Sequence, residues 1–145
     1  MKNKGYIIVF VGLLCLLMGA CTQYKGRIGD LFGSWVLREM TIDGASADAL
    51  QYENTYWSFQ NSIIHVVREE PGLHVYGAYG SFVHTGDELM FDFAIDDIFY
   101  VPEWLGFPAD GKVTLNIAKL DSHWLEAVYI APDGKNYHYK FEKTW

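Results

Sequence analysis

The stretch Leu31-Phe32-Gly33-Ser34-Trp35 marks the point at which the character of the sequence changes. Before it lie a strongly apolar leader and a short polar segment, and after it come short aromatic-rich segments separated by turn residues. Such segments are typical of β-strands, because flat and branched side chains pack well on a pleated surface. The sequence therefore predicts one β domain over residues 31–145 and a different role for the residues before it.

The N-terminal segment has the layout of a bacterial export signal. Lys2 and Lys4 provide a positive start, an apolar run extends over residues 6–18, and Gly19-Ala20-Cys21 follows. The apolar run is shorter than the about 20 residues that a membrane-spanning helix needs. We therefore predict that residues 1–20 are a signal peptide that is removed on export. The alternatives are a plain secretory signal with an accidental cysteine and an uncleaved anchor helix.

The sequence Met18-Gly19-Ala20-Cys21 resembles the lipobox of bacterial lipoproteins, although that pattern usually has leucine where Met18 stands. The resemblance implies that Cys21 is lipidated, becomes the first residue of the mature protein and carries acyl chains such as palmitate. Several acyl chains hold a protein stably on a bilayer, whereas one chain binds only marginally. Residues 21–30 are then a lipidated tether. Thr22 favours the outer membrane of the cell envelope by enterobacterial sorting rules, with the membrane face left open.

Composition excludes several classes of function. Cys15 and Cys21 are the two cysteines of the chain, and both lie at or before the predicted start of the tether, so the domain has no disulfide framework or thiolate metal cluster. Without residues 1–20, which contain Lys2 and Lys4, 9 basic and 18 acidic residues remain, a formal charge of −9. Such a surface repels nucleic acid, and no basic cluster interrupts it. We expect no nucleic-acid partner.

Eight segments of the domain alternate between apolar and polar side chains, as strands with one buried face do. Short turn sequences such as Asn61-Ser62 separate them. Gly77 and Gly80 interrupt the longest segment and predict a bulge or a sharp bend. Residues 45–54 show no stripe, so we expect a loop with at most one turn of helix. The predicted strands span residues 34–41, 55–60, 63–69, 73–85, 88–94, 112–120, 123–130 and 135–143.

Eight antiparallel strands in sequence order, each with one apolar face, are most simply closed into an up-and-down barrel. Closure removes the strand edges that would otherwise aggregate. A barrel of eight strands is just wide enough to be filled by side chains or to hold one small ligand. The predicted fold is therefore an all-β, eight-stranded antiparallel barrel with one short helical insertion at residues 95–110. The alternative is a β-sandwich of two sheets.

Several short motifs, in this order, are similar to those of the lipocalin-like lipoproteins of Bacteroidetes, and they span nearly all of the predicted domain. Gly33-Ser34-Trp35 resembles the Gly-x-Trp start of lipocalin-type barrels. The resemblance implies that Trp35 closes the floor of the barrel and that the protein binds a small apolar molecule, although many members have no known ligand. The other motifs are Trp57-Ser58-Phe59, Gly77-Ala78-Tyr79, Asp87-Glu88-Leu89 and residues 137–141.

Residues 95–110 depart from the strand pattern because they combine prolines with a high density of apolar and aromatic side chains. Asp96 and Asp97 are placed to cap a short helix. Exposure of so many apolar groups is unfavourable, so they must cover something. The alternatives are a plug that completes the barrel core, a lid over a ligand, and a contact with a partner protein or the bilayer.

The sequence predicts a membrane-anchored protein that binds a small hydrophobic or amphipathic ligand at the end of the barrel covered by residues 95–110. The alternative is a non-enzymatic envelope protein whose filled barrel docks a partner protein through residues 95–110. We expect no cofactor. The candidate ligand-binding residues carry aromatic rings on the predicted inner face or in the insertion: Trp57, Phe59, Phe91, Phe93, Tyr137, Tyr139, Phe99 and Trp104.

The sequence does not support an enzyme or a metal site. It contains no Gly-x-Ser-x-Gly, His-Glu-x-x-His or phosphate-loop motif. Asp92, Asp96 and Asp97 cluster, but adjacent acids are more often a solvated face or a helix cap. The histidines show no spacing typical of ligands; pairing of two strands around Glu70-Pro71-Gly72 could bring His65 and His74 together, a partial site at best.

Overall fold

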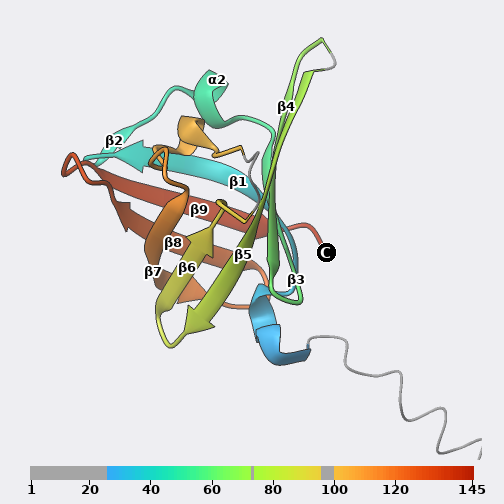
Figure 1. The fold of residues 1–145 in the computed structure, drawn as a ribbon. Coiled ribbons are helices and arrows are strands. Elements are labelled where there is room, and N and C mark those ends of the chain that lie inside the picture. Colours follow the sequence, from blue (N-terminus) through green and yellow to red (C-terminus); the bar gives the residue numbers. More distant parts are fainter. Residues whose placement is uncertain (1–25, 73, 96–99) are drawn as a thin grey trace, which may run out of the picture.

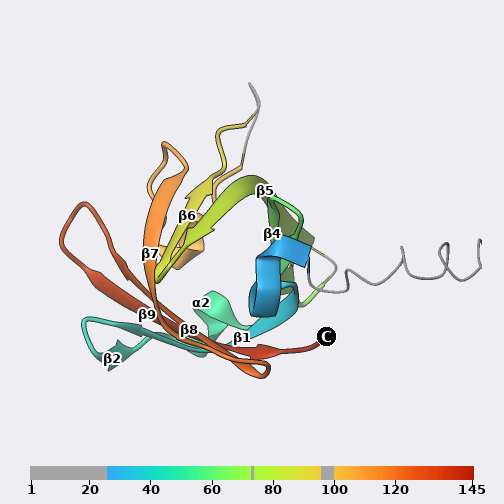
Figure 2. The same ribbon diagram turned by 90° about the horizontal axis from the view of Figure 1, so that it is seen from below.

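The structure, a computed structural model, describes residues 26–72, 74–95 and 100–145, and eight of its strands form a closed antiparallel barrel (Figures 1 and 2). Neighbouring strands follow one another in sequence, and β9 returns to pair with β1 from Trp35↔Lys143 to Ile42↔Tyr137. The strands are β1 (Gly33–Ile42), β3 (Thr55–Gln60), β4 (Ile63–Glu70), β5 (His74–Thr85), β6 (Glu88–Asp92), β7 (Lys112–Leu120), β8 (Trp124–Ile130) and β9 (Asn136–Lys143).

The predicted eight-stranded barrel is confirmed, and its closure excludes the β-sandwich. A ninth strand, β2 (Ala45–Ser46), was not predicted and lies outside the barrel, where it pairs with the end of β1 at Thr41 and Ile42. Two residues are too few to show a period of two, so no sequence pattern marks this strand.

Helical structure is limited to short turns in the described residues. α2 (Ala49–Tyr52) begins at Asp48, whose side chain accepts a hydrogen bond from the Leu50 backbone N–H at 3.0 Å. This confirms the turn of helix expected in residues 45–54. The other two are η2 (Gly26–Leu31) and η3 (Glu103–Leu105), the latter being the short helix of the insertion. None of the described helices has the length and apolar character needed to cross a membrane.

Of the two alternatives predicted at Gly77 and Gly80, a bulge or a sharp bend, the bulge was wrong. The register between β4 and β5 runs without a shift from Ile63↔Ser81 to Glu70↔His74, past both Gly77 and Gly80. At Gly80 the missing side chain serves close packing, because a Cβ there would lie 2.9 Å from Cδ1 of Phe93.

β6 is shorter than predicted, since it ends at Asp92 instead of Ala94. The Asp92 carboxylate accepts a hydrogen bond from the Ala94 backbone N–H at 3.0 Å, and Phe93 N–H bonds to the Gly111 carbonyl at 3.0 Å. The first bond closes a turn after Asp92, and the second holds Phe93 beside the residue that precedes β7.

The two ends of the barrel differ. η2 lies at one end, where the buried Trp35 donates its indole N–H to the Leu31 carbonyl at 2.9 Å. The position of Trp35 agrees with the floor role that the family resemblance implied. The tip of the β4–β5 hairpin, α2 and η3 lie at the opposite end, which we call the mouth (Figure 1).

Candidate ligand-binding site

The interior of the barrel is packed with aromatic rings. Six of the predicted ligand-binding residues are buried there, as the alternation of β3, β6 and β9 predicted: Trp57, Phe59, Phe91, Phe93, Tyr137 and Tyr139. Their rings contact one another and further core rings; Trp57 lies 5.3 Å from Phe91 and 4.3 Å from Phe141 between centroids. Contact of these six residues with a ligand stays a prediction.

A side chain from the insertion completes this core. Phe107 is buried, and its ring centroid lies 5.6 Å from that of Tyr129, 6.1 Å from that of Trp57 and 6.1 Å from that of Phe93. These rings belong to β8, to β3 and to the residue that follows β6. Phe107 therefore acts as a plug between opposite walls of the barrel, which was one of the alternatives for residues 95–110.

Backbone geometry and one buried hydrogen bond hold the plug in place. η3 ends at Gly106, whose φ of 79° is left-handed, and Tyr137 packs so closely that a Cβ on Gly106 would lie 2.3 Å from its Cζ. The Tyr139 hydroxyl donates to the Leu105 carbonyl. Burial raises the pKa of Tyr139 far above its usual value, so the phenol stays protonated and remains a donor.

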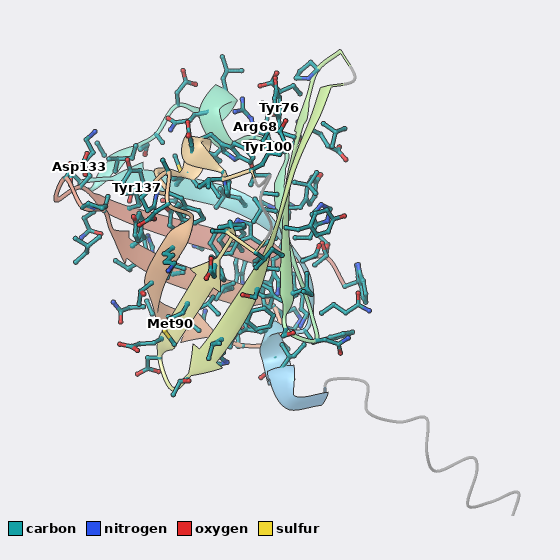
Figure 3. All side chains as sticks on the ribbon, viewed as in Figure 1. Arg68, Tyr76, Met90, Tyr100, Asp133 and Tyr137 are labelled. Carbon is teal, nitrogen blue, oxygen red and sulfur yellow. The ribbon has the colours of Figure 1, made fainter. Side chains whose placement is uncertain are left out.

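At the mouth lies a pocket of about 380 Å³. One wall is the first part of β5, and the other is the segment Tyr100–Trp104 that leads into Phe107. Figure 3 shows Tyr76 and Tyr100 at this end of the molecule, near Arg68. The side chains and backbone that line the pocket belong to Val75, Tyr76, Gly77, Ala78, Tyr100, Val101 and Trp104.

Trp104 is fixed in the pocket wall by its neighbours. The guanidinium carbon of Arg68 lies 5.9 Å from the centroid of the Trp104 ring, and the Gln51 side chain donates to the Trp104 carbonyl at 3.1 Å. Arg68 also lies 3.0 Å from a carboxylate oxygen of Glu70. The indole N–H of Trp104 is buried and has no hydrogen-bond partner among the residues described. The pocket is thus lined mainly by apolar and aromatic side chains, and the Trp104 indole N–H is buried behind its surface.

Comparison with known proteins agrees with this architecture. The family model described as a lipocalin-like domain matches residues 15–100. The chain belongs to the lipocalin-like family. A lipocalin-like protein from Bacteroides uniformis has a similar structure, with a TM-score of 0.60 and 22% identity over 79% of this chain and 99% of that chain. An uncharacterized protein from Bacteroides eggerthii reaches a TM-score of 0.59 with 18% identity, covering 78% and 98%. No curated protein matches significantly.

Of the two predicted residues in the insertion of this lipocalin-like chain, Trp104 lines the pocket, whereas Phe99, like Asp96 and Asp97, lies outside the described residues. Sequence reasoning missed the β5 wall, Val75 to Ala78. The signal available was the unequal length of the two neighbouring segments, 73–85 and 88–94, which leaves part of the longer one without a partner on one side.

The lipocalin-like barrel does not bring His65 and His74 together. In the pairing of β4 with β5, His65 lies opposite Tyr79 and stacks on its ring at 3.9 Å, whereas His74 lies opposite Glu70. The hairpin therefore separates the two histidines along its length, and the suggested partial metal site was wrong. Within residues 26–72, 74–95 and 100–145, no group of three or more histidine, cysteine or acidic side chains is placed to hold a metal ion.

Other hollows of the lipocalin-like barrel are lined by described residues outside 95–110. One, of about 380 Å³, crosses β5, β6 and β7 beside Asp92 and Lys112. Another, of about 280 Å³, lies between α2 and β1 beside Arg38 and Glu53. Charged groups border both, so the pocket at the mouth is the stronger candidate for an apolar ligand.

Proposed function

We propose that the protein binds a small hydrophobic or amphipathic molecule, without catalysis, in the pocket between β5 and Tyr100–Trp104. The observation that carries the proposal is this pocket of about 380 Å³, whose size lies within the usual range for ligand sites. The lipocalin-like fold supports a binding role. In this proposal the ligand rests at the mouth, between the first part of β5 and Tyr100–Trp104.

Replacement of Trp104 by alanine tests this proposal. We expect the dissociation constant for the apolar fluorescent probe N-phenylnaphthylamine to rise at least about tenfold, or about 1.4 kcal/mol, because an aromatic wall is lost. The measurement is a fluorescence titration of the soluble protein comprising residues 22–145, with the fold checked by circular dichroism.

The matched control is Trp124→Ala. Like Trp104, Trp124 is half-buried and has a cationic side chain over its ring, with Lys140 Nζ 5.1 Å from the ring centroid. It lies on β8 and does not line the pocket. We expect this variant to bind the probe as the parent protein does. Equal losses in the two variants, or a parent protein that does not bind the probe, would contradict the proposal.

We further propose that Cys21 is lipidated and anchors the protein to the cell envelope, at the outer membrane. Support comes from the sequence, where the small residues Gly19 and Ala20 precede Cys21 after an apolar run. Cys21→Ala is expected to leave the membrane fraction and to take up no labelled palmitate, whereas Cys15→Ala is the control that keeps both properties. A Cys21→Ala protein that still fractionates with membranes and is labelled would contradict the anchor.

A second candidate function is the docking of an envelope protein through the insertion. It is favoured by exposed apolar side chains at the mouth, since Tyr100 is 73% exposed and Val75 is 64% exposed. This candidate uses the same surface as the ligand pocket, so the chemistry of the pocket wall decides what kind of molecule fits there.

A further inference from the structure

One wall of the pocket is an open strand edge. β4 pairs with β5 over the whole range from His74 to Ser81, but β6 pairs with β5 only from Ser81 to Thr85. Among the described residues, no strand lies beside the other edge of β5 before Ser81. β6 ends at Asp92, which lies opposite Ser81, so β6 has no residues that could pair with the part of β5 before Ser81.

Backbone groups on this edge point into the open space. The Phe82 N–H donates to the Ser62 carbonyl at 2.9 Å, so the even-numbered residues of β5 direct their backbone groups toward β4. Residues of an antiparallel strand alternate in this respect, and Val75, Gly77 and Tyr79 therefore face the other way. Val75 and Gly77 also line the pocket.

We propose that the pocket binds a peptide segment in extended conformation, which pairs with the open edge of β5 from Val75 to Tyr79 and places an apolar side chain against Trp104. This inference rests on the proposed function, because it names the ligand class of the same pocket. An extended peptide supplies alternating N–H and C=O groups at the spacing of the edge, and a recognition mode in which a peptide extends a sheet is common. A purely aliphatic ligand would leave these backbone groups unpaired.

The surrounding side chains fit such a partner. Val75 and Tyr79 are 64% and 59% exposed, and their side chains would become cross-strand neighbours of the added strand.

Charge indicates the flanks of the peptide. Glu69 and Glu103 are exposed near the pocket, whereas the guanidinium of Arg68 is paired with Glu70 at 3.0 Å. The exposed carboxylates of Glu69 and Glu103 therefore make the surroundings of the pocket negatively charged, which favours a peptide with basic ends. The segment Tyr100–Trp104 forms the pocket wall opposite β5, and a wall at this position hinders the approach of a second copy's sheet.

Isothermal titration with three peptides tests the inference on the soluble protein, residues 22–145, which contain the complete barrel. The parent peptide is acetylated, amidated Lys-Val-Thr-Phe-Thr-Val-Lys. In an extended peptide, odd and even backbone N–H groups point toward opposite edges of the peptide. One control peptide is methylated on its odd backbone nitrogens and the other on its even ones, so each control loses the hydrogen-bond donors of one peptide edge. We expect the parent to bind and only one control to bind at least tenfold more weakly.

Three results would overturn the inference: no binding of the parent peptide, equal affinity of all three peptides, or equal weakening in both controls. Titration with N-phenylnaphthylamine separates this failure from failure of the proposed function. If the probe binds and depends on Trp104 while the peptides behave in one of these ways, the pocket is a ligand site but the edge does not pair. If the protein sediments as a dimer and the parent peptide does not dissociate it, the β5 edge would instead pair with a second copy of the chain.

Discussion

Gly106→Ala is expected to lower the free energy of unfolding by about 3 kcal/mol or more, a large effect for one added methyl group. Two costs combine. A left-handed backbone costs a residue with a Cβ roughly 1–2 kcal/mol, and forcing extra volume into a packed core costs about 1–3 kcal/mol. Gly106 has a φ of 79°, and the new Cβ would lie 2.3 Å from Tyr137 Cζ, so either the ring or η3 must move.

Gly134→Ala is the matched control for this change. Gly134 has a φ of 87°, but a Cβ added there would have no neighbouring atom within 4 Å, so only the backbone cost of roughly 1–2 kcal/mol applies. Urea denaturation of both variants measures the difference. If both lose the same stability, Tyr137 does not hold the plug as described.

Phe107→Ala is expected to lower the free energy of unfolding by about 3–5 kcal/mol, the usual cost of removing a buried phenylalanine ring. It should also open an apolar cavity in the barrel, because the ring contacts Trp57, Phe93 and Tyr129 on different sides. Empty apolar cavities in proteins stay dry and take up molecules such as benzene. We therefore expect the variant to bind benzene and to regain part of its stability when benzene is present.

Phe107→Leu is the control for the cavity. It keeps most of the volume, so we expect a smaller loss of stability and no uptake of benzene. Urea denaturation with and without benzene distinguishes the variants. An alanine variant that loses less than about 1 kcal/mol would mean that Phe107 does not fill the barrel, and residues 95–110 would then be a lid and not a plug.

The strands and the interior rings could be predicted because each strand repeats one signal many times. Phe91 and Phe93, for example, follow the period of two that buries one face. The plug could not be predicted as such, since the residues around Phe107 have no period, and the same apolar density fits a plug, a lid or a contact surface. Only the three-dimensional structure, in which Phe107 lies between opposite walls of the barrel, distinguishes the plug from the other two alternatives.

Gly80 and the pocket likewise depend on contacts between residues that are distant in the sequence, and local sequence patterns do not predict such contacts. A glycine in a strand pattern indicates a bulge or a close approach, and only the position of Phe93 distinguishes them. The open edge of β5 also depends on where β6 ends, at Asp92. Local patterns report which face of a strand is buried, but not where its neighbour stops.

The position of η2 at the floor has a consequence for how a ligand arrives. An extended chain spans at most about 3.6 Å per residue, so the few residues between Cys21 and Gly26 would keep the floor within about 20 Å of a lipid anchor. The mouth, at the far end of the barrel, would then open toward the aqueous compartment (Figure 1). If Cys21 carries the proposed lipid anchor and the barrel stands upright on the membrane, the pocket faces ligands in solution and not the lipids of the anchoring leaflet.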